Sequence, residues 1–98
     1  MSHYAFEWDP KKARANHAKH GIAFPEAKSV FEDRFAVEVF DEAHSTEEDR
    51  FIIVGTSEEN RLLTVAFTLR DHDIIRIISA RESMRGERLA YEKQIGKR

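Results

Sequence analysis

The sequence predicts one α+β domain, in which an antiparallel sheet carries its helices on a face. A chain of 98 residues has room for a single hydrophobic core. Helix signals gather near the two ends of the chain, and runs of apolar residues with strand character follow one another between them. Such grouping, in place of a strict alternation of strands and helices, is typical of α+β folds. We expect one domain over residues 1–98.

The first part of the chain is expected to form a strand and two helices. Residues 4–8 alternate large apolar residues with small or polar ones, as strands do. Asp9 then supplies an N-cap and Pro10 a first helical residue for a helix that runs to about His20. Gly21 ends this helix. A second helix of about two turns begins near Pro25, with apolar residues at helical spacing.

The rest of the chain is expected to form four strands and a closing helix. The strands are predicted at residues 35–40, 50–55, 62–69 and 74–80, separated by acidic or turn-forming segments. The closing helix runs from about Ser83, which caps it, to Ile95. Gly96 ends it. The predicted order is therefore strand, helix, helix, four strands, helix.

Composition excludes several classes of protein. The chain has no cysteine, which excludes a disulfide scaffold, a thiolate zinc site and a cysteine nucleophile, and fits the reducing cytoplasm that we expect. We expect no membrane association, because the longest apolar runs are far shorter than the roughly 20 residues of a membrane span. A glycine-rich phosphate loop is missing, which excludes ATP and NAD enzymes and leads us to expect no cofactor.

Charge is unevenly divided along the chain. Residues 1–28 carry a formal charge of +2, residues 29–60 a charge of −8 and residues 61–98 a charge of +4. This division favours a surface that faces a polyanion, built from the two ends of the chain. The acidic middle is either a platform for a basic partner or a solvated surface.

The last predicted strand carries the most informative residue. Arg76 interrupts an isoleucine-rich run and is expected on the face of Ile74 and Ile78, with Ser79 and Arg81 on the other face. A guanidinium in a central strand is costly to bury alone. Arg76 is therefore either salt-bridged or part of a wet concavity that binds an anion.

Further arginines follow this strand or precede it. Arg81, Arg85 and Arg88 are spaced to gather on one side of a helix start, and Arg70 ends the preceding strand. The arginine fork matches the oxygens of a phosphodiester. For Arg85 and Arg88 the alternative is a solvated helix face.

Two histidines lie three residues apart near the end of the first helix. His17 and His20 can share a helix face, but no third ligand stands at a suitable spacing, so we expect no metal. His20 is either a structural cap at the helix C-terminus or a proton-transfer group.

Two motifs resemble the BrnT family of bacterial toxins. They are F-x-W-D-x-x-K-x-x-x-N-x-x-K-H-G at residues 6–21 and I-I-S-A-R at residues 77–81, within a similarity that extends from about residue 4 to residue 92. The resemblance implies a RelE-like fold and a type II toxin that is neutralised by a BrnA antitoxin encoded beside it. Gly86 and Met84 depart from the family pattern and predict a looser, less basic start of the last helix.

The resemblance also implies an activity, namely metal-independent RNA cleavage that inhibits translation. In such enzymes basic side chains hold the scissile phosphate while the 2′-hydroxyl of the RNA attacks phosphorus. We expect catalytic roles for Lys19, His20, Arg76 and Arg81. We expect RNA contacts from Lys12, Arg50, Arg70, Arg85, Arg88 and Tyr91.

The implied partners are RNA and a BrnA-like antitoxin, in a toxin–antitoxin hetero-oligomer that reaches promoter DNA only through the antitoxin. The alternative is a non-catalytic protein that binds the antitoxin within a DNA-binding autorepressor complex. Induced expression in a bacterium separates the two hypotheses, because only a ribonuclease should stop growth and translation.

Overall fold

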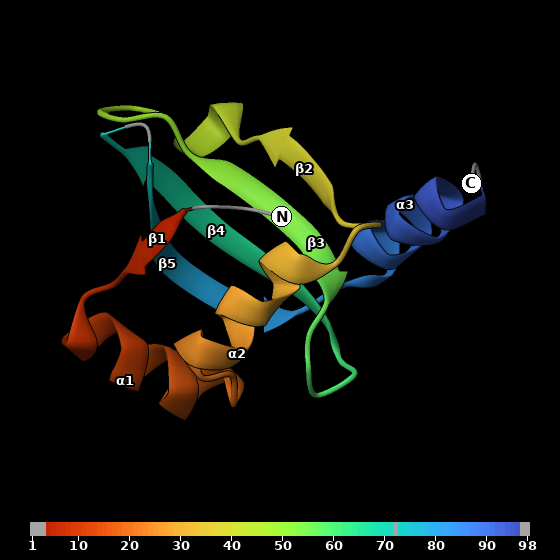
Figure 1. Cartoon of the computed structure of the whole chain (residues 1–98), viewed down its shortest axis with the longest axis horizontal. Coiled ribbons are helices and arrows are strands. Elements are labelled where there is room, and N and C mark those ends of the chain that lie inside the picture. Colours follow the sequence, from red (N-terminus) through yellow and green to blue (C-terminus); the bar gives the residue numbers. More distant parts are fainter. Residues whose placement is uncertain (1–3, 72, 97–98) are drawn as a thin grey trace.

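The chain forms a five-stranded sheet with helices before and after the main run of strands (Figure 1). The computed structural model describes residues 4–71 and 73–96. Along the chain the elements are β1 (Ala5–Glu7), α1 (Pro10–His20), α2 (Phe24–Ser29), the 3-10 helix η1 (Val30–Glu32), β2 (Val37–Phe40), the 3-10 helix η2 (Glu42–His44), β3 (Phe51–Thr56), β4 (Leu62–Arg70), β5 (Ile74–Glu82) and α3 (Arg85–Gly96). Within the described ranges, no helix has the length and apolar character needed to cross a bilayer.

The ends of α1 are set by local side-chain and backbone chemistry. A carboxylate oxygen of Asp9 accepts a hydrogen bond of 2.9 Å from the Lys11 N–H, and Pro10 is the first helical residue. At the other end, Gly21 has φ 72°, and its N–H donates to the His17 carbonyl over 2.8 Å. Glycine adopts this left-handed conformation without steric cost, which directs the chain from α1 towards α2.

The sheet is mixed, which corrects the antiparallel sheet that the sequence predicts. The strand order is β1-β5-β4-β3-β2, and every neighbouring pair is antiparallel except β1 and β5, which are parallel. Alternation of residues identified β1 as a strand but carries no information about its partner. The segment that contains α1 and α2 separates β1 from the other strands in sequence, and β1 pairs with the last of them.

One face of the sheet, which we call the core face, is closed by α1, α2 and η1. Ile22, Phe24 and Val30 contribute from the helical side and are at most 1 % exposed. Their partners come from β3, β4 and β5, namely Ile53, Leu63, Val65, Phe67, Ile75, Ile77 and Ala80. This face carries the main hydrophobic core of the domain.

A bulge in β5 changes which side chains share a face. Phe67 pairs with Ile77 and Ala66 pairs with Ser79, so Ile78 is an extra residue without a partner on β4. Ala80 consequently returns to the core face and is fully buried there. Arg76 and Arg81 therefore lie on the same face, the second one, which corrects the expectation that they point to opposite faces.

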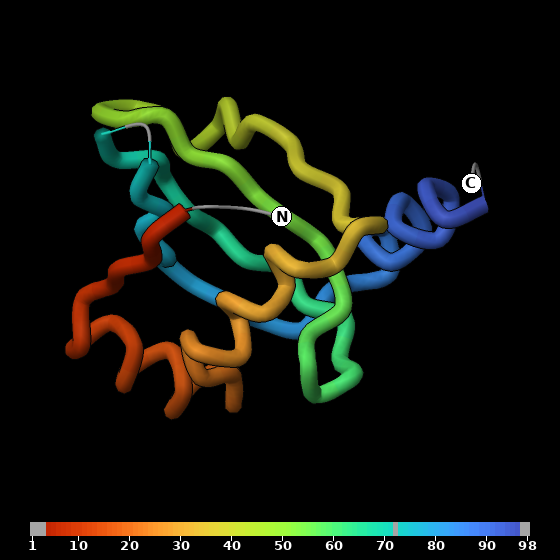
Figure 2. Tube along the Cα trace, viewed as in Figure 1, coloured from red at the N-terminus to blue at the C-terminus, as the bar shows by residue number. Residues whose placement is uncertain are grey.

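The second face is covered only in part. Val54 and Leu62 pack with Tyr91 of α3, and Phe35 and Ile52 pack against this small cluster. The tube in Figure 2 shows α3 extending away from the sheet. The part of the second face that lies on β4 and β5 carries polar side chains.

Candidate functional site

Polar and charged side chains gather on the second face of the sheet. The strand register sets Arg76 opposite Thr68 and Arg81 opposite Thr64, and the β5 bulge puts both arginines on this side. We call this surface the arginine face and define it by Glu7, Thr64, Thr68, Arg70, Arg76, Ser79 and Arg81. Both threonines are buried, whereas the two β5 arginines are about one-third exposed.

Arg76 is held by a carboxylate from the neighbouring strand. Its Nη1 donates to Oε2 of Glu7 over 2.9 Å, and Nη1 of Arg70 lies 3.9 Å from the same oxygen. Glu7 sits opposite Arg76 in the parallel pairing of β1 and β5. Of the two roles left open by the sequence, the structure shows the salt bridge, with the guanidinium still partly accessible to solvent.

Arg81 is bound by a bidentate carboxylate at the start of α3. Its two terminal nitrogens donate to the two oxygens of Glu87 over 2.8 and 2.7 Å. Glu87 also accepts from the Thr64 hydroxyl and from the Met84 N–H, each over 2.8 Å. Glu87 therefore connects β4, β5 and α3.

The same contacts shift the pKa of both partners. Hydrogen bonds from Arg81 are the largest cause that lowers the pKa of Glu87 to about 2, against the opposing effect of burial. The pKa of Arg81 is raised, chiefly by the hydrogen bond to Glu87. Glu87 is thus an anion throughout the neutral range, and Arg81 remains charged beside it.

Glu87 also replaces Ser83 as the residue that caps α3. The sequence predicts a cap from Ser83, but the Ser83 hydroxyl lies 2.8 Å from the Thr64 hydroxyl. The N–H of Met84, just before the helix, is instead satisfied by Glu87 in its first turn. This geometry is one half of a capping box, with the glutamate three residues after the capped N–H.

Tyr91 is buried at the inner side of α3. It is 8 % exposed, and its hydroxyl donates to Oδ2 of Asp33 over 2.5 Å and lies 3.0 Å from Oγ1 of Thr56. Burial, followed by the hydrogen bond to Asp33, raises the pKa of Tyr91. The structure therefore gives this residue, expected at the RNA, a role in fastening α3 to the sheet.

Lys12, Lys19 and His20 lie apart from the arginine face. All three are exposed on α1, which packs on the core face, whereas the side chains of Arg76 and Arg81 point from the second face. The four residues expected to act in catalysis are therefore separated into two groups. Sequence spacing could not show this, because it depends on which side of the sheet α1 covers.

The remaining predicted RNA contacts are scattered around the second face and its margins. Arg50 immediately precedes β3 and lines a cavity of about 280 Å³ in the β2–β3 loop, together with Glu47 and Glu48. Arg85 and Arg88 are exposed on α3. Arg85 and Arg88 follow Arg81 in sequence, but only Arg81 belongs to the arginine face.

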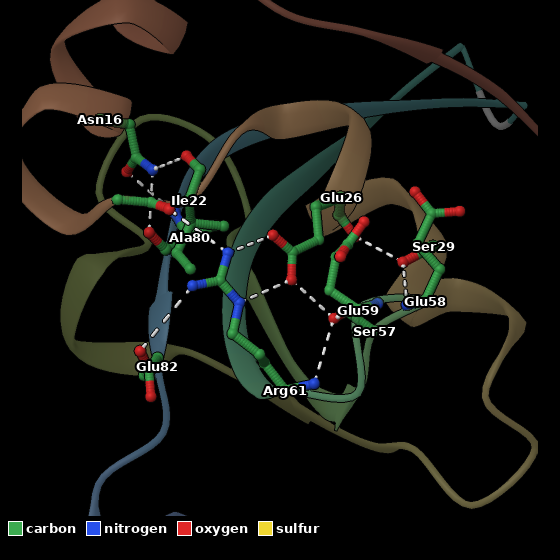
Figure 3. A network of polar contacts seen from close by, with 11 residues as sticks. Asn16, Ile22, Glu26, Ser29, Ser57, Glu58, Glu59, Arg61, Ala80 and Glu82 are labelled. Carbon is green, nitrogen blue, oxygen red and sulfur yellow. Dashed lines mark hydrogen bonds and ion pairs between the residues drawn. The ribbon is translucent and has the colours of Figure 1, made fainter.

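An ion pair between buried Glu26 and partly exposed Arg61, on the other side of the sheet, was not predicted from the sequence (Figure 3). Glu26 is 7 % exposed and accepts from Nη2 and Nε of Arg61, the latter over 3.0 Å, and from the Ser57 hydroxyl over 2.7 Å. The hydrogen bond from Arg61 is the largest cause that lowers the pKa of Glu26. The signal available in the sequence was an acidic residue at a core position of a short helix.

Asn16 explains part of the opening motif in structural terms. Its amide nitrogen donates to the carbonyls of Ala80 over 2.9 Å and of Ile22 over 3.0 Å, and its oxygen accepts from the Ala80 N–H over 3.0 Å (Figure 3). These bonds attach α1 to β5 next to Arg81. The motif residue Asn16 therefore positions the strand.

Potential metal ligands do not cluster in the described part of the chain. His17 and His20 are exposed on α1. Across residues 4–71 and 73–96, no group of three or more histidine, cysteine, aspartate or glutamate side chains is placed to hold a metal ion.

Comparisons with known proteins identify the family. The model of the BrnT toxin family, described as the ribonuclease toxin of a type II toxin–antitoxin system, matches residues 8–87. The crystal structure of the Brucella abortus ribonuclease toxin BrnT has a similar fold, with a TM-score of 0.61 and 21 % sequence identity, over 84 % of this chain and 99 % of that chain. A search of curated proteins found no match. The chain belongs to the BrnT family of ribonuclease toxins of type II toxin–antitoxin systems.

Proposed function

We propose that the chain is a metal-independent endoribonuclease whose scissile phosphate binds on the arginine face. The observation that carries this proposal is the β5 bulge, which brings Arg76 and Arg81 to one side of the sheet. Two guanidinium groups that remain partly exposed can hold phosphate oxygens and the negative charge that develops on them. The family description supports ribonuclease activity.

In this mechanism the reaction follows the RelE-like pattern. The 2′-oxygen forms a bond to phosphorus while the bond from phosphorus to the 5′-oxygen breaks. The 2′-hydroxyl loses its proton to a base, and the departing 5′-oxygen gains one. Arg76 and Arg81 bind the non-bridging oxygens, so that phosphate replaces the carboxylates of Glu7 and Glu87.

The proposal assigns the other predicted residues to RNA that extends beyond the cleaved bond. Lys12, Lys19 and His20 would meet such RNA at α1, and the imidazole of His20 is the group among them proposed to act in general acid–base catalysis. The remaining contacts would come from Arg50, Arg70, Arg85, Arg88 and Tyr91. For Tyr91 this requires a shift of α3, because the hydroxyl is now bonded to Asp33.

We further propose that cleavage inhibits translation in the cytoplasm and that an antitoxin resembling BrnA binds the toxin and carries the complex to promoter DNA. Membership of a type II family supports the antitoxin as a partner. Induced expression should stop growth and protein synthesis, and co-expression of the antitoxin should restore both.

Cleavage of RNA by purified variants tests the proposed site. Arg76→Ala or Arg81→Ala should each lower kcat/KM by about 10²-fold or more, as the loss of one donor to a transition state does. Arg14→Ala, an exposed arginine on α1, is the matched control and should cleave normally. Wild-type cleavage should persist in EDTA. Normal cleavage by both folded β5 variants would remove the arginines from the site.

A second candidate function is antitoxin binding without catalysis, within a DNA-binding autorepressor complex. One observation favours it, since Arg76 and Arg81 are each already paired with a carboxylate. In that case induced expression of the toxin alone would leave growth and translation unchanged, and the purified chain would not cleave RNA.

A further inference from the structure

The edge of the sheet formed by β2 has backbone groups that face no other strand of the described part of the chain. Within residues 4–71 and 73–96, β2 is the last strand in the order and pairs only with β3. The Asp41 N–H donates to the Arg50 carbonyl over 2.8 Å, which continues the ladder beyond the strand. Because antiparallel ladders alternate, the bonded positions continue at Val39, and the backbone groups of Glu38 and Phe40 face outward.

Apolar side chains of β2 are also exposed on both sides of this edge. Val39 is 53 % exposed and Phe40 is 50 % exposed. Phe40 contacts Phe51 edge to face, with ring centroids 5.7 Å apart, so one side of its ring remains free. A strand laid beside β2 would bind the outward backbone groups and cover these two side chains.

The surroundings of this edge are strongly acidic. From Glu38 to Arg50 the chain carries six carboxylates and one arginine. Apart from Asp41, these carboxylates are exposed; they belong to Glu38, Asp41, Glu42, Glu47, Glu48 and Asp49. The opposite edge, β1, is only three residues long and its one charge, Glu7, is paired with Arg76. The β2 edge is therefore complementary in charge to a basic partner, whereas the β1 edge is not.

We propose that the β2 edge binds an extended, positively charged segment of the antitoxin, which adds to the sheet as a sixth strand. This inference rests on the antitoxin partner of the proposed function. Main-chain hydrogen bonds to Glu38 and Phe40 supply the register, and neighbouring side chains of the added strand, which point to opposite faces, meet Val39 and Phe40. Lysine or arginine residues next to them face the acidic β2–β3 loop, which steers the approach of the partner.

Proline at an outward position tests the backbone contact. Phe40→Pro removes an outward N–H while leaving the bonded positions of β2 intact, and proline is tolerated on edge strands in this orientation. Phe40→Ala removes the same ring but keeps the N–H. Leu89→Ala, 53 % exposed on α3, is the control for exposed apolar area.

Binding is measured by calorimetry with the purified product of the neighbouring antitoxin reading frame. Phe40→Pro should weaken binding at least about tenfold relative to Phe40→Ala, and Leu89→Ala should stay within about twofold of wild type. Equal affinities of the proline and alanine variants would overturn strand addition. Self-association of the toxin through this edge, with unchanged antitoxin affinity, would also overturn it by assigning the edge to a second copy.

Hydrogen exchange at the backbone amides of the wild-type toxin is a second test of strand addition, which does not require Phe40→Pro to fold. In nuclear magnetic resonance experiments the Glu38 and Phe40 amides should exchange at least about tenfold more slowly in the complex. Unchanged exchange at both amides would contradict the proposal. RNA cleavage by the free wild-type toxin is measured separately, so that a failure of the ribonuclease proposal is distinguished from a failure of this docking site.

The positive charge of the segment is tested by its salt dependence. Neutralising the loop with Glu47→Gln, Glu48→Gln and Asp49→Asn should reduce the fall in association rate with added salt, while RNA cleavage stays near the wild-type level. An unchanged salt slope in stopped-flow binding would contradict a basic partner at this edge.

Discussion

The two faces of the sheet are built from the same strands but differ in the helices and side chains that cover them. The core face is closed by α1, α2 and η1 over a continuous apolar layer. The second face is closed by α3 over only a small cluster around Tyr91, and its remaining part carries Arg76 and Arg81 in ion pairs with Glu7 and Glu87. One face thus stabilises the fold, and the other keeps Arg76 and Arg81 paired with carboxylates and partly exposed.

The core face should respond to truncation with the largest loss of stability. Leu63→Ala removes a fully buried side chain and should lower the free energy of unfolding by about 2–5 kcal/mol. Leu89→Ala, on exposed α3, should change it by less than about 0.5 kcal/mol. Urea unfolding of both variants measures the difference. Equal losses would show that the core is not concentrated on this face.

On the second face, the pairing of Glu87 should appear as a pH dependence of stability. Its pKa of about 2 lies below the ordinary value of 4.5, so its contribution is present above about pH 4.5 and is lost as the pH falls towards 2. We expect this contribution to be about 1–3 kcal/mol. Unfolding free energies of wild type and Glu87→Gln should converge between these pH values. A constant difference would contradict the ion pair.

Two glycines offer a matched comparison of the faces. A Cβ at Gly55 would lie 2.9 Å from Cγ1 of Val30 under the core face, whereas a Cβ at Gly86 on α3 would meet no atom within 4 Å. Gly55→Ala should therefore destabilise the fold by about 1–3 kcal/mol. Gly86→Ala should stabilise it by up to about 1 kcal/mol, because alanine favours the helix. Thermal unfolding of both variants measures the two changes in stability. Changes of the same sign would contradict the comparison.

The smallest expected change in stability concerns His20, which sequence left as a cap or a proton-transfer group. As a proton-transfer group, its replacement in His20→Gln should flatten the pH–rate profile of RNA cleavage near neutrality and preserve the Tm. As a cap, the same change should cost about 0.3–1 kcal/mol of stability with unchanged kinetics. His17→Gln, one turn earlier and also exposed, is the control.

Local patterns in the sequence predicted most helices and strands, because each of these elements depends on residues that are close together in the sequence. The helix from Pro10 to His20 has the bounds that its capping signals indicate. Alternation could not predict that β1 is parallel to β5, nor the extra residue Ile78, since both depend on contacts with distant strands. For the same reason the face shared by Arg76 and Arg81 became visible only in the folded sheet.

The partners of the site were also beyond sequence reasoning. Glu7 and Glu87 are surface-type residues in the sequence, and only the strand register and the start of α3 place them on Arg76 and Arg81. Glu26 and Arg61 are 35 positions apart and meet only in the folded chain, where the Arg61 side chain reaches Glu26 on α2. Ion pairs between residues far apart in the sequence were therefore not predicted and are known only from the structure.

We propose that Arg76 and Arg81 hold one phosphodiester on the second face of the sheet. A double-mutant cycle on RNA cleavage tests it directly, with kcat/KM measured for Arg76→Ala, Arg81→Ala and the variant that carries both changes. Residues that act as a unit give strongly non-additive losses. The kcat/KM of the double variant should therefore lie close to that of the less active single variant. A loss equal to the product of the two single losses would show that the arginines act independently and would contradict a shared phosphate site.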